Sequence, residues 1–134
     1  MSGTEGTTDW RQLREFKGVD LTASFVLSWQ VEGHSLQLDV DVSLLPQHPF
    51  YEAPRPSERG CYHAAVLEFP ACTALALHNE GTARPLVALA KGLGPGRIEG
   101  LRRTSEGGYE IRGAFGEIAI RSDRPLLRLK ASTP

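Results

Sequence analysis

The chain has 134 residues, of which 15 are basic and 16 are acidic, so its formal net charge at pH 7 is -1. This length suits a single domain with an ordinary core, and the near-even charge gives no reason to expect binding to nucleic acid or to an anionic membrane. The N-terminus lacks the pattern of a secretory signal and no stretch is apolar over a membrane-spanning length, so we expect a cytoplasmic protein.

The N-terminal segment divides into a polar tail and a short amphipathic stretch. Residues 1–8 are small and polar, which is typical of a flexible N-terminus. Asp9 and Gln12 have the spacing of a capping box. Three apolar residues would share one helical face: Trp10, Leu13 and Phe16. The pattern predicts a short helix over 9–17 that covers one end of a sheet, and a single antiparallel β domain over 9–134.

The clearest pattern is the alternation of apolar and polar residues on both sides of Gly33-His34. A two-residue loop that begins with glycine favours a type II′ hairpin turn. This turn would place four apolar pairs opposite one another: Val31 and Leu36, Trp29 and Leu38, Leu27 and Val40, Phe25 and Val42. All eight would then lie on one buried face. The other face, which includes Ser24, Asp39 and Asp41 and has Val26 as its one apolar exception, would meet solvent.

A proline-rich loop follows the hairpin, with the sequence LPQHPFYEAPRPSERGCYH over 45–63. Prolines remove backbone donors and exclude a central strand, and loops of this length are uncommon in compact domains unless they are functional or disordered. Aromatic residues and arginine dominate recognition surfaces. We therefore expect partner or ligand binding by Phe50, Tyr51, Glu52, Arg55 and His63. The competing interpretation is that Phe50 and Tyr51 only cover the mouth of the sheet.

The second half of the chain has the pattern of further strands. Cys61 to Phe69 alternates and ends at Pro70, and ACTALALH over 71–78 also resembles a strand. PLVALAKG over 85–92 fits either a short helix or a buried strand, and we favour the strand. LLRLK over 126–130 would close the sheet.

Two turns in this half can be placed from local chemistry. A turn at Glu106-Gly107 would set Arg103 opposite Glu110, an attractive pair. The apolar phase shifts by one residue near Gly116, which indicates a β-bulge. With about eight or nine strands and short corners, the fold class is an all-β antiparallel barrel or sandwich with a short N-terminal helix.

No group of residues predicts catalysis, a metal or a cofactor. Cys61 and His63 lie two apart on a strand, roughly 6 to 7 Å, which is too long for a nucleophile and its base. Asp39 and Asp41 project together, but no dense set of metal ligands surrounds them. The spacing of Cys61 and Cys72 fits a disulfide between neighbouring strands, although the expected compartment favours thiols.

The sequence supports two functions. The first is a non-enzymatic binding protein that contacts a partner protein or a second subunit through the loop 45–60. The second is a small ligand-binding barrel or small enzyme whose polar mouth is lined by Asp39, Asp41, Tyr51, Arg55 and His63. We do not expect nucleic acid as a partner, because few aromatics interleave the arginines of the second half.

Overall fold

The computed structural model describes residues 8–53, 56, 60–77, 90, 92–105 and 107–130. Within these ranges, it describes Ala74 and Leu77 by their backbone alone. Nine strands lie in these ranges: β1 Thr8–Asp9, β2 Val19–Glu32, β3 Ser35–Leu44, β4 Cys61–Phe69, β5 Ala74–Leu77, β6 Gly96–Arg103, β7 Tyr109–Gly113, β8 Gly116–Arg121 and β9 Leu126–Leu129. Two 3-10 turns, η1 Trp10–Gln12 and η2 Arg14–Phe16, precede β2.

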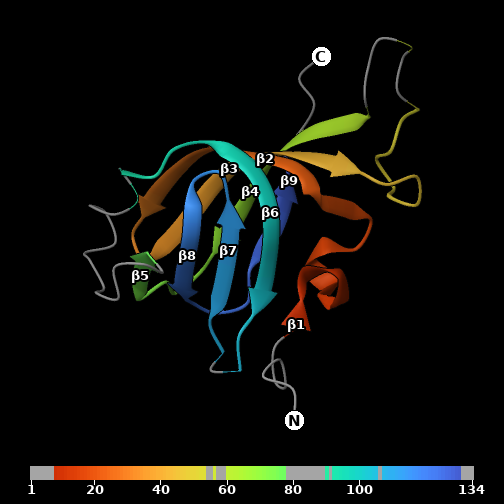
Figure 1. The fold of residues 1–134 in the computed structure, drawn as a ribbon. Helices are drawn as coiled ribbons and strands as arrows, with labels where there is room; N and C mark the ends of the chain where they lie inside the picture. The colour runs from red at the N-terminus through yellow and green to blue at the C-terminus, as the bar shows by residue number, and fades with distance from the viewer. Residues whose placement is uncertain are drawn as a thin grey trace.

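All strand pairs are antiparallel and belong to one sheet, in the order β5-β8-β7-β6-β2-β3-β4-β9, with β1 paired to β6. The sheet curls, so that β6, β7 and β8 form a layer in front of β3, β4 and β9 (Figure 1). The predicted all-β antiparallel fold is confirmed. Within the described ranges β5 and β9 are edge strands that do not pair with each other, so the sheet is not closed into a barrel.

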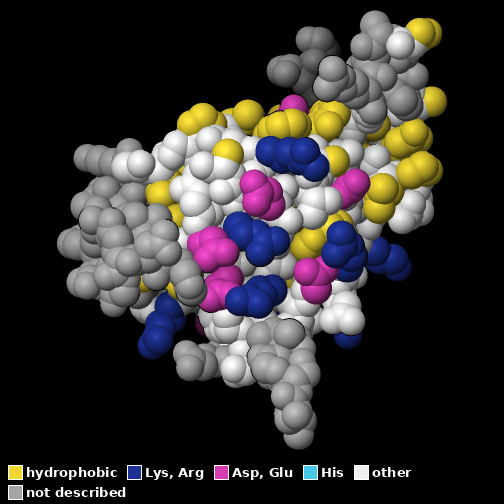
Figure 2. Space-filling model, viewed as in Figure 1, with side chains coloured by type: hydrophobic (Ala, Val, Ile, Leu, Met, Phe, Trp, Pro, Cys, Tyr) yellow, Lys and Arg dark blue, Asp and Glu magenta, His cyan; other side chains and the backbone are white. Residues whose placement is uncertain are grey.

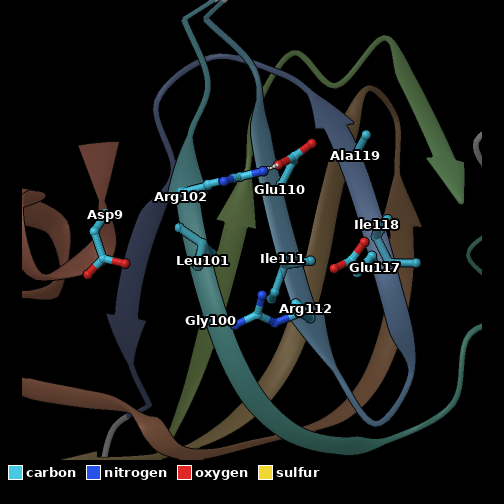
Figure 3. A pocket seen from close by; sticks show the side chains of 10 residues that line it. All are labelled: Asp9, Gly100, Leu101, Arg102, Glu110, Ile111, Arg112, Glu117, Ile118 and Ala119. Atoms are coloured by element: carbon cyan, nitrogen blue, oxygen red, sulfur yellow. Dashed lines mark hydrogen bonds and ion pairs between the residues drawn. The ribbon is translucent and has the colours of Figure 1, made fainter. Parts of the chain in front are cut away.

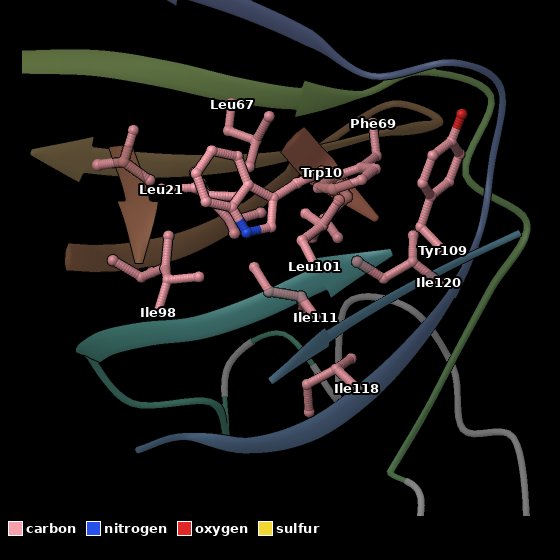
Figure 4. Packing of buried hydrophobic residues seen from close by; sticks show 14 of the residues in the cluster. Trp10, Leu21, Leu67, Phe69, Ile98, Leu101, Tyr109, Ile111, Ile118 and Ile120 are labelled. Atoms are coloured by element: carbon pink, nitrogen blue, oxygen red, sulfur yellow. The ribbon is translucent and has the colours of Figure 1, made fainter. Parts of the chain in front are cut away.

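The core lies between the two layers. Leu67 and Phe69 project from β4 toward Leu101 on β6 and Ile111 on β7, with the ring of Trp10 among them (Figure 4). The rings of Phe69 and Tyr109 lie 5.8 Å apart and join the layers directly. Each large side chain removed from water here contributes roughly 1.5 to 3 kcal/mol to stability.

The N-terminal segment differs from the predicted helix. Leu13 has an extended backbone, with φ -91° and ψ 131°, and it separates two 3-10 turns. Asp9 caps the first turn by accepting a hydrogen bond from the Arg11 N–H. Trp10 and Phe16 are both buried. They anchor the turns between β6 on one side and β2 and β9 on the other, so this segment is shaped by its two core anchors rather than by helix propensity.

The β2–β3 hairpin confirms the predicted turn and corrects the predicted register. Gly33 has φ +63°, and the pairs nearest the turn, including Trp29 with Leu38, are as expected. A β-bulge at Leu27 then shifts the pairing, so that Val26 rather than Leu27 lies opposite Val40. Val26 is consequently 1% exposed, whereas Leu27 is 55% exposed. The eight apolar residues therefore do not share one face.

A second break in the β2–β3 ladder is bridged by Ser24, which the sequence placed in solvent. Ser24 is completely buried. Its Oγ donates to the carbonyl of Asp20 at 2.8 Å and accepts the N–H of Ser43 at 2.9 Å. The register shifts between Asp20 and Phe25, so the hydroxyl replaces backbone hydrogen bonds that the shift removes.

The β6–β7 hairpin is also one residue out of the predicted register. Arg102, not Arg103, lies opposite Glu110, and Leu101 lies opposite Ile111. The loop has three residues, not two, because Gly107 adopts φ +87° and completes the turn. This register satisfies the charge pair and the apolar pair together.

The change of apolar phase near Gly116 comes from a hairpin rather than a bulge. Gly113 and Gly116 are paired, and Ala114-Phe115 forms a two-residue turn between β7 and β8. The predicted strand Cys61–Phe69 is confirmed. The strands predicted over 71–78 and 126–130 are present but shorter, as Ala74–Leu77 and Leu126–Leu129, and the last one does not close the sheet. The segment 85–92 lies outside the described residues except for Ala90 and Gly92, whose backbone is helical rather than extended.

No described helix is long and apolar enough to cross a bilayer.

Candidate functional site

Large apolar side chains are exposed at one end of the β2–β3–β4 layer. Five such side chains are exposed in the described ranges: Phe25, Leu27, Phe50, Tyr62 and Leu126. Phe25, Leu27 and Tyr62 belong to β2 and β4, and the rings of Phe25 and Tyr62 lie 6.2 Å apart on the outer face. Phe50 belongs to the loop that enters β4 at the same end, where it stacks on His63, which lies opposite the inward-facing Val42. Leu126 lies opposite Glu68 at the far end of β4. We call the first four residues the apolar surface. Figure 2 shows hydrophobic side chains along the top and upper right, around β2 and this loop.

The first part of the proline-rich loop is held by backbone hydrogen bonds. The N–H of Leu45 donates to the carbonyl of Gly18 at 2.9 Å, and the N–H of His48 donates to the carbonyl of Leu45 at 2.9 Å. The N–H of Tyr51 then donates to the carbonyl of His48 at 3.0 Å. Tyr51 packs against the core. The loop is therefore fixed to the sheet as far as Tyr51, which suits a preorganised surface.

Phe50 contacts two imidazole rings. Its ring centroid is 5.8 Å from that of His48 and 6.1 Å from that of His63, with which it is stacked. The Nδ1 of His48 accepts the N–H of Phe50 at 3.1 Å. The Phe50 ring is still 61% exposed. These contacts hold a large aromatic ring in place and leave most of it facing solvent.

The predicted loop residues therefore have different positions. Phe50 and His63 contact each other, whereas Tyr51 turns toward the core. Glu52 is exposed, and its N–H lies 3.4 Å from the Sγ of Cys61. Arg55 lies outside the described residues. No disulfide joins Cys61 to Cys72.

Sequence reasoning missed Phe25, Leu27 and Tyr62. An unbroken hairpin register places Phe25 and Leu27 on the buried face. Val26 was the signal: it was the one apolar residue on the supposedly polar face, and the bulge turns it into the core.

Asp41 lies on the outer face of β3, beside the aromatic side chains of Phe25 and Tyr62. Phe25 is directly opposite it on β2, and Tyr62 is diagonal to it on β4. The rings of Phe25 and Tyr62 are 6.2 Å apart, and because β3 runs between their strands they meet over β3. Burial raises the pKa of the Asp41 carboxyl, and the nearby His63 partly offsets this increase.

Asp39, two residues away on the same face, has the opposite environment. Its carboxylate accepts hydrogen bonds from Ser28 at 3.0 Å and forms an ion pair with Lys130 at 3.0 Å. The hydrogen bond from Lys130 lowers the pKa of Asp39, against a smaller effect of burial. Asp39 and Asp41 both face outward while Tyr51 packs inward, so these three do not converge on one polar mouth. The described residues hold no group of three or more metal-ligand side chains.

A groove of about 340 Å³ crosses the outer face of β6, β7 and β8 (Figure 3). Arg102 Nε donates to Glu110 across it at 2.6 Å. The guanidinium of Arg112 lies over Gly100, 3.4 Å from where a Cβ would be, and 3.9 Å from Glu99. Basic and acidic side chains alternate on this face (Figure 2). Because these charges pair within the face, it offers little to a charged ligand.

Comparison with known proteins leaves the function to be argued from this geometry. No family model, curated protein or solved structure matches the chain.

Proposed function

We propose that the protein is a non-enzymatic binding protein that contacts another protein through the apolar surface of Phe25, Leu27, Phe50 and Tyr62. One observation carries the proposal: four of the five exposed large apolar side chains of the described ranges belong to one end of the β2–β3–β4 layer, and two of them, Phe25 and Tyr62, bring their rings to 6.2 Å. Scattered exposed apolar residues are ordinary on a monomer, but a contiguous group is typical of interaction sites.

The composition and rigidity of the surface support this role. Rigid aromatic side chains supply large contact areas at low entropic cost and dominate binding hot spots. Phe50 is held by two imidazole rings, and Phe25 is held by Tyr62. A cytoplasmic location is part of the proposal, and the thiols of Cys61 and Cys72 suit it.

The test compares two variants with the wild type. In the surface variant, Leu27→Ser and Phe50→Ser are combined, and in the matched control Leu126→Ser removes a leucine that is equally exposed but distant. Each protein is panned against a random peptide library, and light scattering measures its mass. We expect peptides, or dimers if the partner is a second copy, from the wild type and the control but not from the surface variant. The same result for all three proteins would overturn the proposal.

A further inference from the structure

We infer that the partner inserts a basic side chain, arginine or lysine, between Phe25, Asp41 and Tyr62. We call these three residues the Asp41 clamp. This inference rests on the proposed function, because it specifies which chemistry the apolar surface recognises.

Asp41 lacks the ion pair that two other carboxylates of its layer form. Asp39 pairs with Lys130 at 3.0 Å, and Glu68 pairs with Arg128 at 3.0 Å. Among the described residues, no basic side chain lies within ion-pair distance of Asp41. On this face, cations therefore neutralise Asp39 and Glu68, whereas Asp41, beside the aromatic rings of Phe25 and Tyr62, forms no ion pair.

The basic residues in the same row of the sheet are directed elsewhere. Arg97 lies opposite Phe25 on the side away from Asp41, and its Nε donates to the carbonyl of Thr22 at 2.9 Å. Lys130, whose N–H bonds to Ala64 in the same row, directs its Nζ to Asp39. The sheet thus places two cations near Asp41 and uses both for other contacts.

The clamp has the chemistry that recognises a cation. An arginine or lysine side chain packs its apolar stem against aromatic rings and gains cation–π attraction from their faces. A carboxylate beside the rings adds a charge-assisted hydrogen bond, which is stronger in a partly dehydrated site than in water. A neutral apolar side chain would satisfy the rings but would bury the carboxylate further without a partner.

The probe is the peptide acetyl-Gly-Arg-Gly-amide, titrated into the ¹⁵N-labelled full chain and followed by NMR. We expect saturable shifts at the amides of Phe25, Asp41 and Tyr62. The isosteric citrulline peptide, which is neutral, should cause none. Asp41→Asn should lower the affinity for the arginine peptide by about tenfold or more. The control Asp39→Asn should bind the peptide with the affinity of the wild type.

Three results would overturn the inference: no saturable shift in the wild type, equal shifts with citrulline, or equal affinity for wild type and Asp41→Asn. The outcome remains separable from that of the proposed function. If the selected library peptides require Leu27 and Phe50 for binding but contain no basic residue, the apolar surface is supported as a binding site. Only the inference that it prefers a cationic side chain is then contradicted.

Discussion

Phe25 on β2 lies directly opposite Asp41 on β3, so an exposed aromatic ring stands beside a half-buried carboxylate. The β-bulge at Leu27 creates this pair, because the uninterrupted hairpin would set Phe25 opposite Val42 on the buried face. One extra residue in β2 thus brings the aromatic side chain of Phe25 to the surface and places it beside the carboxylate of Asp41.

The first prediction concerns the cost of that charge. The pKa of Asp41 is raised in the folded state, so protonation of this group favours folding, and its ionisation destabilises the fold as pH rises through the folded pKa. Asp41→Asn should therefore raise the melting temperature at pH 7, and the difference from wild type should shrink as the solution is acidified. Thermal unfolding across a pH series measures this.

Asp39 provides the matched control. Its pKa is lowered in the folded state, so its stabilisation is present above the unfolded pKa and is lost as pH falls through the folded value. Asp39→Asn should lower stability at pH 7 by at most about 1 kcal/mol. If Asp41→Asn lowers the melting temperature as Asp39→Asn does, Asp41 is an ordinary surface carboxylate.

The second prediction tests the bulge. Val26→Ala removes buried methyl groups and should cost about 2 kcal/mol of the free energy of unfolding. Leu27→Ala changes a side chain that is 55% exposed and should cost less than about 0.5 kcal/mol. Urea denaturation of both variants separates the two registers, since the uninterrupted hairpin requires the reverse order.

The third prediction concerns Ser24. Ser24→Ala leaves the buried N–H of Ser43 without its acceptor, which should cost about 1 to 3 kcal/mol. Ser28→Ala removes a hydrogen bond to Asp39 on the exposed face and should change stability by less than about 0.5 kcal/mol. Chemical denaturation measures both, and equal effects would argue against the bridge across the register break.

The fourth prediction concerns the close approach of β6 and the β7–β8 turn. A Cβ on Gly113 would lie 2.3 Å from the carbonyl oxygen of Arg97, whereas a Cβ on Gly94 would meet nothing within 4 Å. Gly113→Ala should therefore destabilise the protein by about 1 to 3 kcal/mol. Gly94→Ala should leave the melting temperature nearly unchanged, and similar melting temperatures for the two variants would contradict this packing.

Hydrophobic alternation and turn chemistry predicted most of the fold. The period of two located β2, β3 and β4, and glycine located the turn at Gly33, because both signals are local. The errors share a cause: an assumed register was extended past an irregularity. The bulge at Leu27 and the three-residue loop before Gly108 each displace the pairing by one residue, and in both cases packing across the sheet decides the register.

The candidate site was predicted only in part for the same reason. Phe50 and His63 belong to one loop and its following strand, so the sequence could associate them. Phe25 and Tyr62 are far apart in sequence and meet only because their strands flank β3. Their exposure depends on the bulge, and one outlying apolar residue, Val26, was its only local sign.

The most direct test of the interaction surface compares two leucines. A photo-crosslinking amino acid replaces Leu27, which is 55% exposed within the surface, or Leu126, which is 50% exposed and distant from it. After illumination in the native cells, we expect a discrete protein adduct from position 27, which the Phe50→Ser change abolishes, and none from position 126. Adducts of equal yield at both positions, or an adduct at 27 that persists without Phe50, would contradict the proposed binding function.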